Sequence, residues 1–163
     1  MTLEDHFNIP EYAGNARWWV SFSALDVDKH VWEVNDINTL RLKYADNDEV
    51  SYRILSYAAH GIQDIADPAE ALKVAQHVND WIYEQIKDKP EHFGSFAVIS
   101  MHDPATAAAE LRRTIAKYGF KGALVNDIQI GPDGQSLMFY KNPSRDIFWN
   151  TCVELNVPFY YPH

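Results

Sequence analysis

Short apolar runs alternate with amphipathic segments along most of the chain. The runs are rich in Val, Ile, Tyr and Phe, which is typical of β-strands. We expect strands at residues 50–57, 94–99, 122–125 and 157–161, and a shorter one at residues 2–4. Helical periodicity lies between the strands, so the order of elements predicts an α/β fold built on a parallel sheet.

Two of the expected helices have clear start signals. Asp67 stands before a proline, and Glu70 follows three residues after Asp67, which is the pattern of a helix N-cap with proline in the first turn. Asp103 stands before a second proline, and Gly119 indicates where that helix stops. These signals predict helices that begin near residues 68 and 104.

Two further helices are expected, one capped by Asp36 and one by Ser144, with a long loop over residues 126–142. Five strands and four helices fit two architectures. One is a complete doubly wound sheet of the flavodoxin type, and the other is the first half of a (β/α)₈ barrel. Both use buried parallel strands, so periodicity does not separate them. The 163 residues predict a single domain over residues 1–163, and a complete barrel needs about 250.

Composition limits the classes of partner. The chain has 14 Lys and Arg against 23 Asp and Glu, a net charge of −9, which argues against nucleic acid and against a polybasic membrane contact. The single cysteine, Cys152, rules out an internal disulfide and fits a reducing compartment. No apolar run approaches the roughly 18 residues of a transmembrane helix, and the first residues lack the apolar core of a signal peptide. We therefore expect a cytoplasmic protein.

Several side chains are candidates for chemistry. Glu4 and His6 are two positions apart at the end of the first expected strand, so they share one face and offer a cation an oxygen and a nitrogen ligand. A surface pair without a role is the other interpretation of this spacing. His163, at the end of the last expected strand, is a further candidate ligand. His60 and His102 lie where strands give way to helices, and a loop or capping role is the simpler interpretation for both.

Other chemistries lack their motifs. The sequence contains no Gly-x-Ser-x-Gly elbow and no Gly-x-Gly-x-x-Gly or Walker-type loop. Cys152 falls in the middle of an expected helix, on its apolar face, so we expect it in the core. Nucleophilic catalysis and nucleotide binding are therefore not supported.

A series of short segments, in a fixed order, resembles one family through nearly all of the chain. The segments include LEDHF at 3–7, ILSY at 54–57, GIQD at 61–64, FGSFA at 93–97, SMHDP at 100–104, YGFKGALVND at 118–127, DIFW at 146–149 and VPFY at 157–160. Together they resemble the metal-dependent decarboxylases of the amidohydrolase superfamily, in the subgroup that acts on 2,3-dihydroxybenzoate, γ-resorcylate and salicylate.

The resemblance implies the half-barrel: about five parallel strands with four intervening helices, from a family of (β/α)₈ barrels. It also implies a divalent metal ion (Zn²⁺, Mn²⁺ or Mg²⁺), with Glu4 and His6 matching the ligands of the family's first strand. The family reaction is non-oxidative decarboxylation of an ortho-hydroxybenzoate, so the implied substrate is a small aromatic carboxylic acid such as 2,3-dihydroxybenzoate. Ala58 and Ala59 match small residues beside the substrate ring, and ordinary packing at a strand end accounts for them equally well.

The chain departs from the family pattern near its end. The family's fifth strand ends with a metal-binding histidine followed by proline, whereas here Pro162 precedes His163. A shift of one residue turns a side chain to the opposite face of a strand. His163 would therefore be a ligand only if the strand end bends or a residue has been lost. The family's acid/base histidine and metal-binding aspartate lie on later strands that this sequence lacks.

A half-barrel leaves strand edges unpaired and one apolar face uncovered. We therefore expect the 163-residue chain to be weakly stable, to form oligomers and to be a poor catalyst alone. One functional hypothesis is a truncated decarboxylase. The alternative is a non-catalytic half-barrel that associates with itself or with full-length paralogous subunits. A flavodoxin-like binding domain and a hydrolase of the wider superfamily are further alternatives.

Overall fold

The structure, a computed structural model, describes residues 36, 37, 39–47, 50–57 and 61–161. The contacts divide the chain into two units, Met1–Ser51 and Tyr52–His163, and each is described by itself. In the first unit, helix α4 (Leu40–Asn47) follows Asp36, whose carboxylate accepts a hydrogen bond from the backbone N–H of Thr39 at 2.7 Å. The strand expected at residues 2–4 lies outside the described residues.

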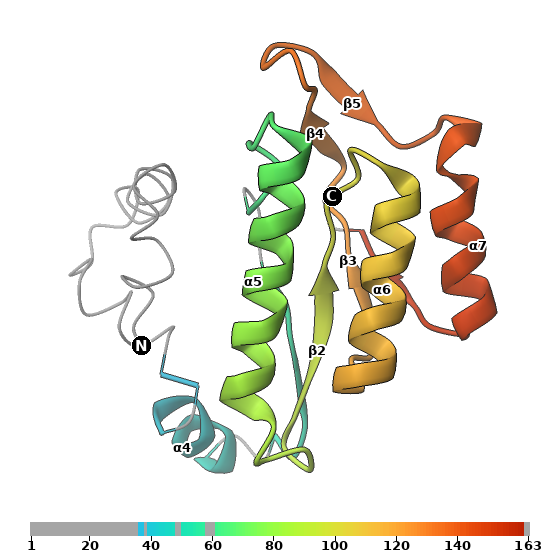
Figure 1. The fold of residues 1–163 in the computed structure, drawn as a ribbon. Helices are drawn as coiled ribbons and strands as arrows, with labels where there is room; N and C mark the ends of the chain where they lie inside the picture. Colours follow the sequence, from blue (N-terminus) through green and yellow to red (C-terminus); the bar gives the residue numbers. More distant parts are fainter. Residues whose placement is uncertain (1–35, 38, 48–49, 58–60, 162–163) are drawn as a thin grey trace. The chain divides into compact units, whose positions relative to one another are not determined.

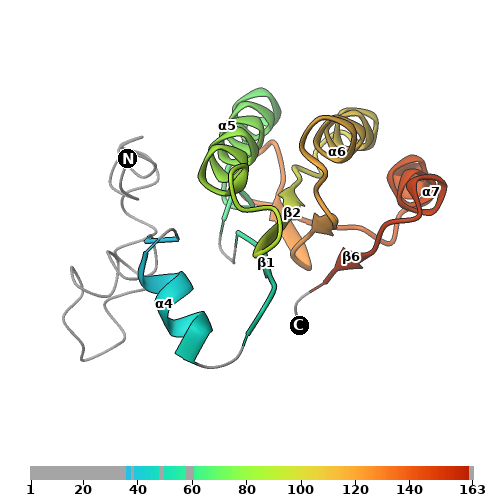
Figure 2. The same cartoon turned by 90° about the horizontal axis from the view of Figure 1, so that it is seen from below.

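The second unit is built on a four-stranded parallel sheet (Figure 1). Its strands are β1 (Arg53–Leu55), β2 (Phe93–Val98), β3 (Gly122–Leu124) and β6 (Phe159–Tyr160), and they lie in the order β1-β2-β3-β6. Each strand pairs in parallel with the next one of the sheet, and the order does not reverse within the described part. Figure 2 shows the three helices of this unit on one face of the sheet.

This arrangement separates the two architectures that the sequence left open. A doubly wound sheet reverses its strand order and carries helices on both faces. Sequential parallel strands with one outer layer of helices are the arrangement of a (β/α)₈ barrel. The α/β half-barrel prediction is confirmed, with four of the expected strands among the described residues.

The helices of the second unit are α5 (Pro68–Ile86), α6 (Pro104–Tyr118) and α7 (Asp146–Leu155). The predicted caps are confirmed: Asp67 accepts a hydrogen bond from Glu70 N at 2.7 Å, and Asp103 accepts one from Ala105 N at 2.9 Å. Gly119 ends α6 with a φ of 67°, a conformation in which glycine has no Cβ to strain. Within the described ranges, none of the helices combines the length and apolarity that a bilayer crossing requires.

Residues 126–142 are not a plain loop, so that prediction is wrong. Strands β4 (Ile128–Ile130) and β5 (Leu137–Phe139) form an antiparallel hairpin in this segment. Asp133 closes the turn by accepting hydrogen bonds from the backbone N–H groups of Gln135 and Ser136 at 3.0 and 2.8 Å. The hairpin extends beyond the carboxyl ends of the parallel strands (Figure 1).

The predicted cap at Ser144 is also wrong. Asn142 accepts a hydrogen bond from the backbone N–H of Ser144 at 2.9 Å and starts a short 3₁₀-helix, Pro143–Arg145. Helix α7 continues directly from this turn without a side-chain cap of its own. Phe148 of α7 is fully buried in the core, and α7 packs against α6.

One buried side chain continues the hydrogen bonding of the sheet where β1 stops pairing. Strand β1 pairs with β2 as far as Ser95. Further along β2, Asn79 of α5 accepts a hydrogen bond from Val98 N at 2.8 Å and donates one to Val98 O at 3.0 Å. The same amide donates to Glu110 of α6 at 2.8 Å, and Arg113 binds that carboxylate at 2.7 and 2.8 Å. Two helices and a central strand are thus joined through buried polar groups.

Candidate functional site

The carboxyl ends of the four parallel strands meet at one edge of the sheet. In barrel enzymes this edge holds the active site, because the loops after the strands converge there. All the site residues that the sequence predicts lie outside the described residues: Glu4, His6, Ala58, Ala59 and His163. Their roles stay predictions, and the edge is built here from the described residues around it.

A buried glutamine connects the hairpin to the end of β2. Gln129 on β4 is 0% exposed. Its Oε1 accepts a hydrogen bond from Met101 N at 2.8 Å, and its Nε2 donates to Ser100 Oγ at 3.2 Å. Both ends of the carboxamide are therefore satisfied, which holds the backbone that leads from β2 into the following loop.

Two amide side chains that bond each other join the segment after β1 to the end of β3. Asn126 Nδ2 donates to Gln63 Oε1 at 2.6 Å, and both side chains are buried. The backbone carbonyl of Gln63 accepts a hydrogen bond from Ile130 N at 2.8 Å. Neutral amides thus tie the hairpin to the ends of three neighbouring strands and add no charge to this edge.

His102 lies in the loop after β2, and its ring is held by the backbone. Its Nε2 is 2.8 Å from the carbonyl oxygen of Ile65, which only accepts, so we assign the proton to Nε2. The buried Nδ1 has no hydrogen-bond partner among the described residues. Arg145 Nη1 donates to the backbone carbonyl of His102 at 3.3 Å. These contacts fit the loop role that the sequence favours for this histidine.

The phenol side chain of Tyr140, directly after β5, is buried at the same edge. Burial raises the pKa of Tyr140 well above its usual range, although the positive charge of Arg145 acts in the opposite direction. The hydroxyl therefore stays protonated at neutral pH. Neither this hydroxyl nor Asn126 Oδ1 has a hydrogen-bond partner in the described part of the chain. Buried polar atoms of this kind are normally satisfied by ordered water or by a ligand.

Metal-ligating side chains do not gather in the described part of the chain. It contains no group of three or more His, Cys, Asp and Glu side chains that could hold an ion. The oxygen and nitrogen donors of Glu4 and His6 suit Zn²⁺ or Mn²⁺ by their chemistry. Cys152 is buried in the core as predicted, and burial raises the pKa of its thiol to about 11, so it is not an activated nucleophile.

The sequence patterns did not reveal the roles of Gln63, Asn126 and Gln129. A partial signal exists for Gln129, because it stands between Ile128 and Ile130 in an apolar run. A polar residue in such a run is either exposed or buried with hydrogen-bond partners. Its partners, Ser100 and Met101, are 29 and 28 residues away, and local spacing does not identify contacts at that separation.

Comparison with known proteins places the chain in a family. Residues 25–163 match the family model described as Amidohydrolase. The γ-resorcylate decarboxylase of Rhizobium sp. (strain MTP-10005) is 35% identical over 160 residues, which cover 98% of this chain and 48% of the relative. The 2,3-dihydroxybenzoate decarboxylase of Aspergillus niger is 34% identical over 142 residues, which cover 83% of this chain and 38% of the relative. The chain spans about half the length, or less, of the curated relatives it matches.

Solved structures agree with the sequence matches. The 2,6-dihydroxybenzoate decarboxylase from Rhizobium superposes with a TM-score of 0.82 at 34% identity, covering 88% of this chain and 44% of that one. The dihydroxybenzoic acid decarboxylase from Polaromonas sp. JS666, solved with bound manganese and the inhibitor 2-nitroresorcinol, superposes with a TM-score of 0.81 at 34% identity, covering 85% of this chain and 42% of that one. The resemblance seen in the sequence is confirmed. The chain therefore belongs to the amidohydrolase family and is related to its hydroxybenzoate decarboxylases.

Proposed function

We propose that this chain carries the amino-terminal half of a metal-dependent decarboxylase that removes CO₂ from an ortho-hydroxybenzoate without oxidation. The observation that carries the proposal is the superposition of its sequential parallel strands on a 2,6-dihydroxybenzoate decarboxylase, at a TM-score of 0.82 and 34% identity. The proposed substrates are small aromatic carboxylic acids such as 2,3-dihydroxybenzoate. Because the chain covers 48% of a relative's length, we expect the 163 residues alone to have low activity.

In this proposal Glu4 and His6 hold a divalent metal ion, with Zn²⁺, Mn²⁺ and Mg²⁺ as the candidate ions. A bound ion of this kind would supply Lewis acidity and would orient the carboxylate and the adjacent phenol oxygen of the substrate. His163 joins the ligands only if the end of its strand bends. Ala58 and Ala59 leave room for the plane of the aromatic ring because their side chains are small.

Uncharged side chains among the described residues would support that site. Gln129 and Gln63 hold the strand ends through hydrogen bonds of 2.6 to 3.2 Å. The protonated phenol of Tyr140 and the amide oxygen of Asn126 are polar groups at the same edge that have no partner within the described ranges. Because these groups carry no charge, in this proposal the metal ion would compensate the negative charge of the substrate carboxylate.

Metal binding gives the first test, because it does not depend on turnover. The purified chain is loaded with Mn²⁺, desalted and analysed by inductively coupled plasma mass spectrometry. A double variant, Glu4→Gln with His6→Gln, is compared with a control, Glu84→Gln with His77→Gln, in which the same residue types change on the exposed side of α5. We expect the wild type and the control to retain about one ion per chain and the double variant to lose at least about tenfold in affinity.

Turnover gives the second test. Release of CO₂ from 2,3-dihydroxybenzoate and from 2,6-dihydroxybenzoate is measured with the same three proteins. Slow release by the wild type and the control, above the level of the double variant, would support the proposal. A wild type that retains no metal, or equal CO₂ release by all three proteins, would overturn it.

A further inference from the structure

Strand β5 of the hairpin directs part of its backbone away from β4. In an antiparallel pair, successive residues point their N–H and C=O groups alternately toward the paired strand and away from it. Gly131 N donates to Ser136 O at 2.7 Å, so Ser136 points into the hairpin. Two residues further along β5, Met138 also points into the hairpin, toward its register partner on β4. The backbone groups of Leu137 and Phe139 therefore point out of it.

The two outer edges of the hairpin differ in their partners. On the β4 side, Ile130 N donates to the carbonyl oxygen of Gln63 at 2.8 Å, so that edge is joined to the rest of the unit. On the β5 side, the outward N–H and C=O groups of Leu137 and Phe139 have no hydrogen-bond partner within the described ranges. Strand β5 is therefore the free edge of the hairpin.

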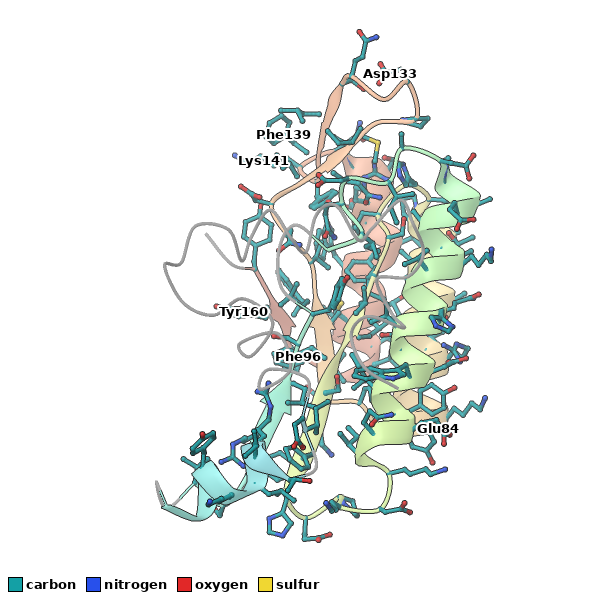
Figure 3. All side chains as sticks on the ribbon, turned by 90° about the vertical axis from the view of Figure 1, so that its left-hand side faces the viewer. Glu84, Phe96, Asp133, Phe139, Lys141 and Tyr160 are labelled. Atoms are coloured by element: carbon teal, nitrogen blue, oxygen red, sulfur yellow. The ribbon has the colours of Figure 1, made fainter. Side chains whose placement is uncertain are left out.

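The side chains on this edge do not protect it. Leu137 is 49% and Phe139 61% exposed, and their side chains share one face because they are two residues apart. Free edges are usually protected by charged residues, proline or a bulge, and the three residues of β5 include no charged residue and no proline. Figure 3 shows Phe139 and Lys141 on one side of the hairpin and Asp133 at its tip. An edge of this kind can accept a further strand.

We propose that the β5 edge pairs with the β5 edge of a second copy of this chain, antiparallel and about a twofold axis. Leu137 of each copy then lies opposite Phe139 of the other, and the two residues exchange N–H···O=C hydrogen bonds in both directions. Met138 lies at the axis, and the exposed side chains of Leu137 and Phe139 from both copies pack together on one face. This inference depends on the hairpin alone and not on the metal or substrate of the proposed function.

A second copy fits this edge because the edge is complementary to itself. A twofold interface requires that residue i contacts residue j and that j contacts i, and Leu137 and Phe139 meet this condition on either side of Met138. The charges beyond the strand also match. Antiparallel pairing places Lys141, past the end of β5, beside the turn that precedes β5 in the second copy, where Asp133 carries a carboxylate. The twofold axis forms this pair of opposite charges twice.

The overall charge opposes association but does not act mainly at this contact. Each copy carries a net charge of −9, whereas residues 128–145 contain one carboxylate, Asp133, and two cations, Lys141 and Arg145. At physiological ionic strength, charges more than about 8 Å apart are largely screened. The paired edge is three residues long, so the interface is small, and we expect a weak dimer whose population depends on concentration.

Concentration dependence gives the first test. Sedimentation velocity of the 163-residue chain, over about a hundredfold range of concentration, should show a shift from monomer toward dimer. Amide hydrogen exchange at both ends of that range should show Leu137 and Phe139 protected only at high concentration. Met138 should be equally protected at both, because its bond lies within the hairpin. A chain that stays monomeric, or one that associates while the Leu137 and Phe139 amides stay unprotected, would overturn the proposal.

Matched variants locate the contact. Leu137→Lys and Phe139→Lys each place a charge where pairing would bury an apolar side chain, and we expect each to raise the dimer Kd by about tenfold or more. Val153→Lys is the control, because Val153 on α7 is 78% exposed and lies outside the hairpin. Thermal melting checks that all three variants remain folded. The same Kd for the edge variants and for the control would contradict pairing at β5.

A charge reversal tests the orientation of the two copies. Lys141→Glu places a carboxylate beside Asp133 of the second copy, and we expect the dimer Kd to rise by about threefold or more because like charges then face each other. Lys73→Glu on α5 changes the net charge by the same amount at a side chain that is 77% exposed. If the two reversals change the Kd equally, the antiparallel pairing that brings Lys141 to Asp133 is incorrect.

Discussion

Replacing Asn79 with alanine gives a demanding test of the hydrogen bonding that holds α5, α6 and β2 together. The Asn79 carboxamide is 0% exposed and bonds both backbone polar groups of Val98, at 2.8 and 3.0 Å. It also donates to Glu110, whose side chain is 2% exposed. Alanine removes all three bonds and leaves no room for a full shell of solvent around the freed groups.

The expected loss of stability follows from the polar groups that Asn79→Ala would leave without a hydrogen-bond partner. A buried donor or acceptor without a partner costs about 1–3 kcal/mol. The N–H and the carbonyl of Val98 would both be left in that state, while Glu110 would keep its two bonds to Arg113. We therefore expect Asn79→Ala to lower the free energy of unfolding by about 3–4 kcal/mol, which corresponds to a fall of about 10 °C in Tm for a chain of this size.

Urea unfolding followed by circular dichroism measures this difference directly. The matched control is Gln76→Ala, which shortens an exposed amide side chain on the same helix, and we expect it to change stability by less than about 0.5 kcal/mol. The slope of free energy against urea should stay the same for both variants. If Asn79→Ala loses less than about 1 kcal/mol, the carboxamide does not replace a strand partner, and the account of this part of the sheet is incorrect.

Two further predictions concern ionisable groups. Burial alone would raise the pKa of Asp80, but hydrogen bonds from Tyr118 and Arg113 outweigh burial and hold that pKa below 3.8. A carboxyl whose folded pKa is depressed stabilises the fold above its unfolded pKa. In urea titrations, the stability difference between wild type and Asp80→Asn should therefore be fully present above pH 3.8 and should shrink as the pH falls below 3.8 toward the depressed pKa of the folded state. A difference that stays constant over this range would show that the pKa of Asp80 is not depressed. For Cys152, burial raises the thiol pKa from 9.0 to about 11, so iodoacetamide at pH 8 should react about a hundredfold more slowly with the native chain than with the urea-unfolded chain. Equal rates would show that the thiol is accessible.

The helices were predictable because their signals are local. Asp67 and Asp103 each cap a helix whose first turn begins with proline, and the structure forms both caps with hydrogen bonds of 2.7 and 2.9 Å. The choice between a barrel and a doubly wound sheet was not local. It depends on which face of the sheet each helix packs against, and parallel strands have the same composition in both architectures.

The sequence does not predict the β4–β5 hairpin, for a different physical reason. Its strands have three residues each, which is too short for alternation to stand out, and a Gly-Pro pair between them resembles an ordinary loop. What stabilises the hairpin is Gln129, which reaches the backbone after β2 from 28 residues away. Sequence periodicity reports which face of an element is apolar, but it does not report distant hydrogen-bond partners.

In this chain, the described side chains that support the strand ends are distinct from the residues proposed to bind the metal ion. This distinction changes how a loss of activity should be interpreted. The strand ends are held by Gln63, Asn126 and Gln129 through bonds between protein groups, so their positions do not depend on a metal ion. If a longer protein that contains these residues decarboxylates its substrate and the 163-residue chain alone does not, the difference arises from residues other than those that hold the strand ends. If the 163-residue chain alone instead loses its native hydrogen bonds at the strand ends, further polypeptide is needed for folding and not only for catalysis.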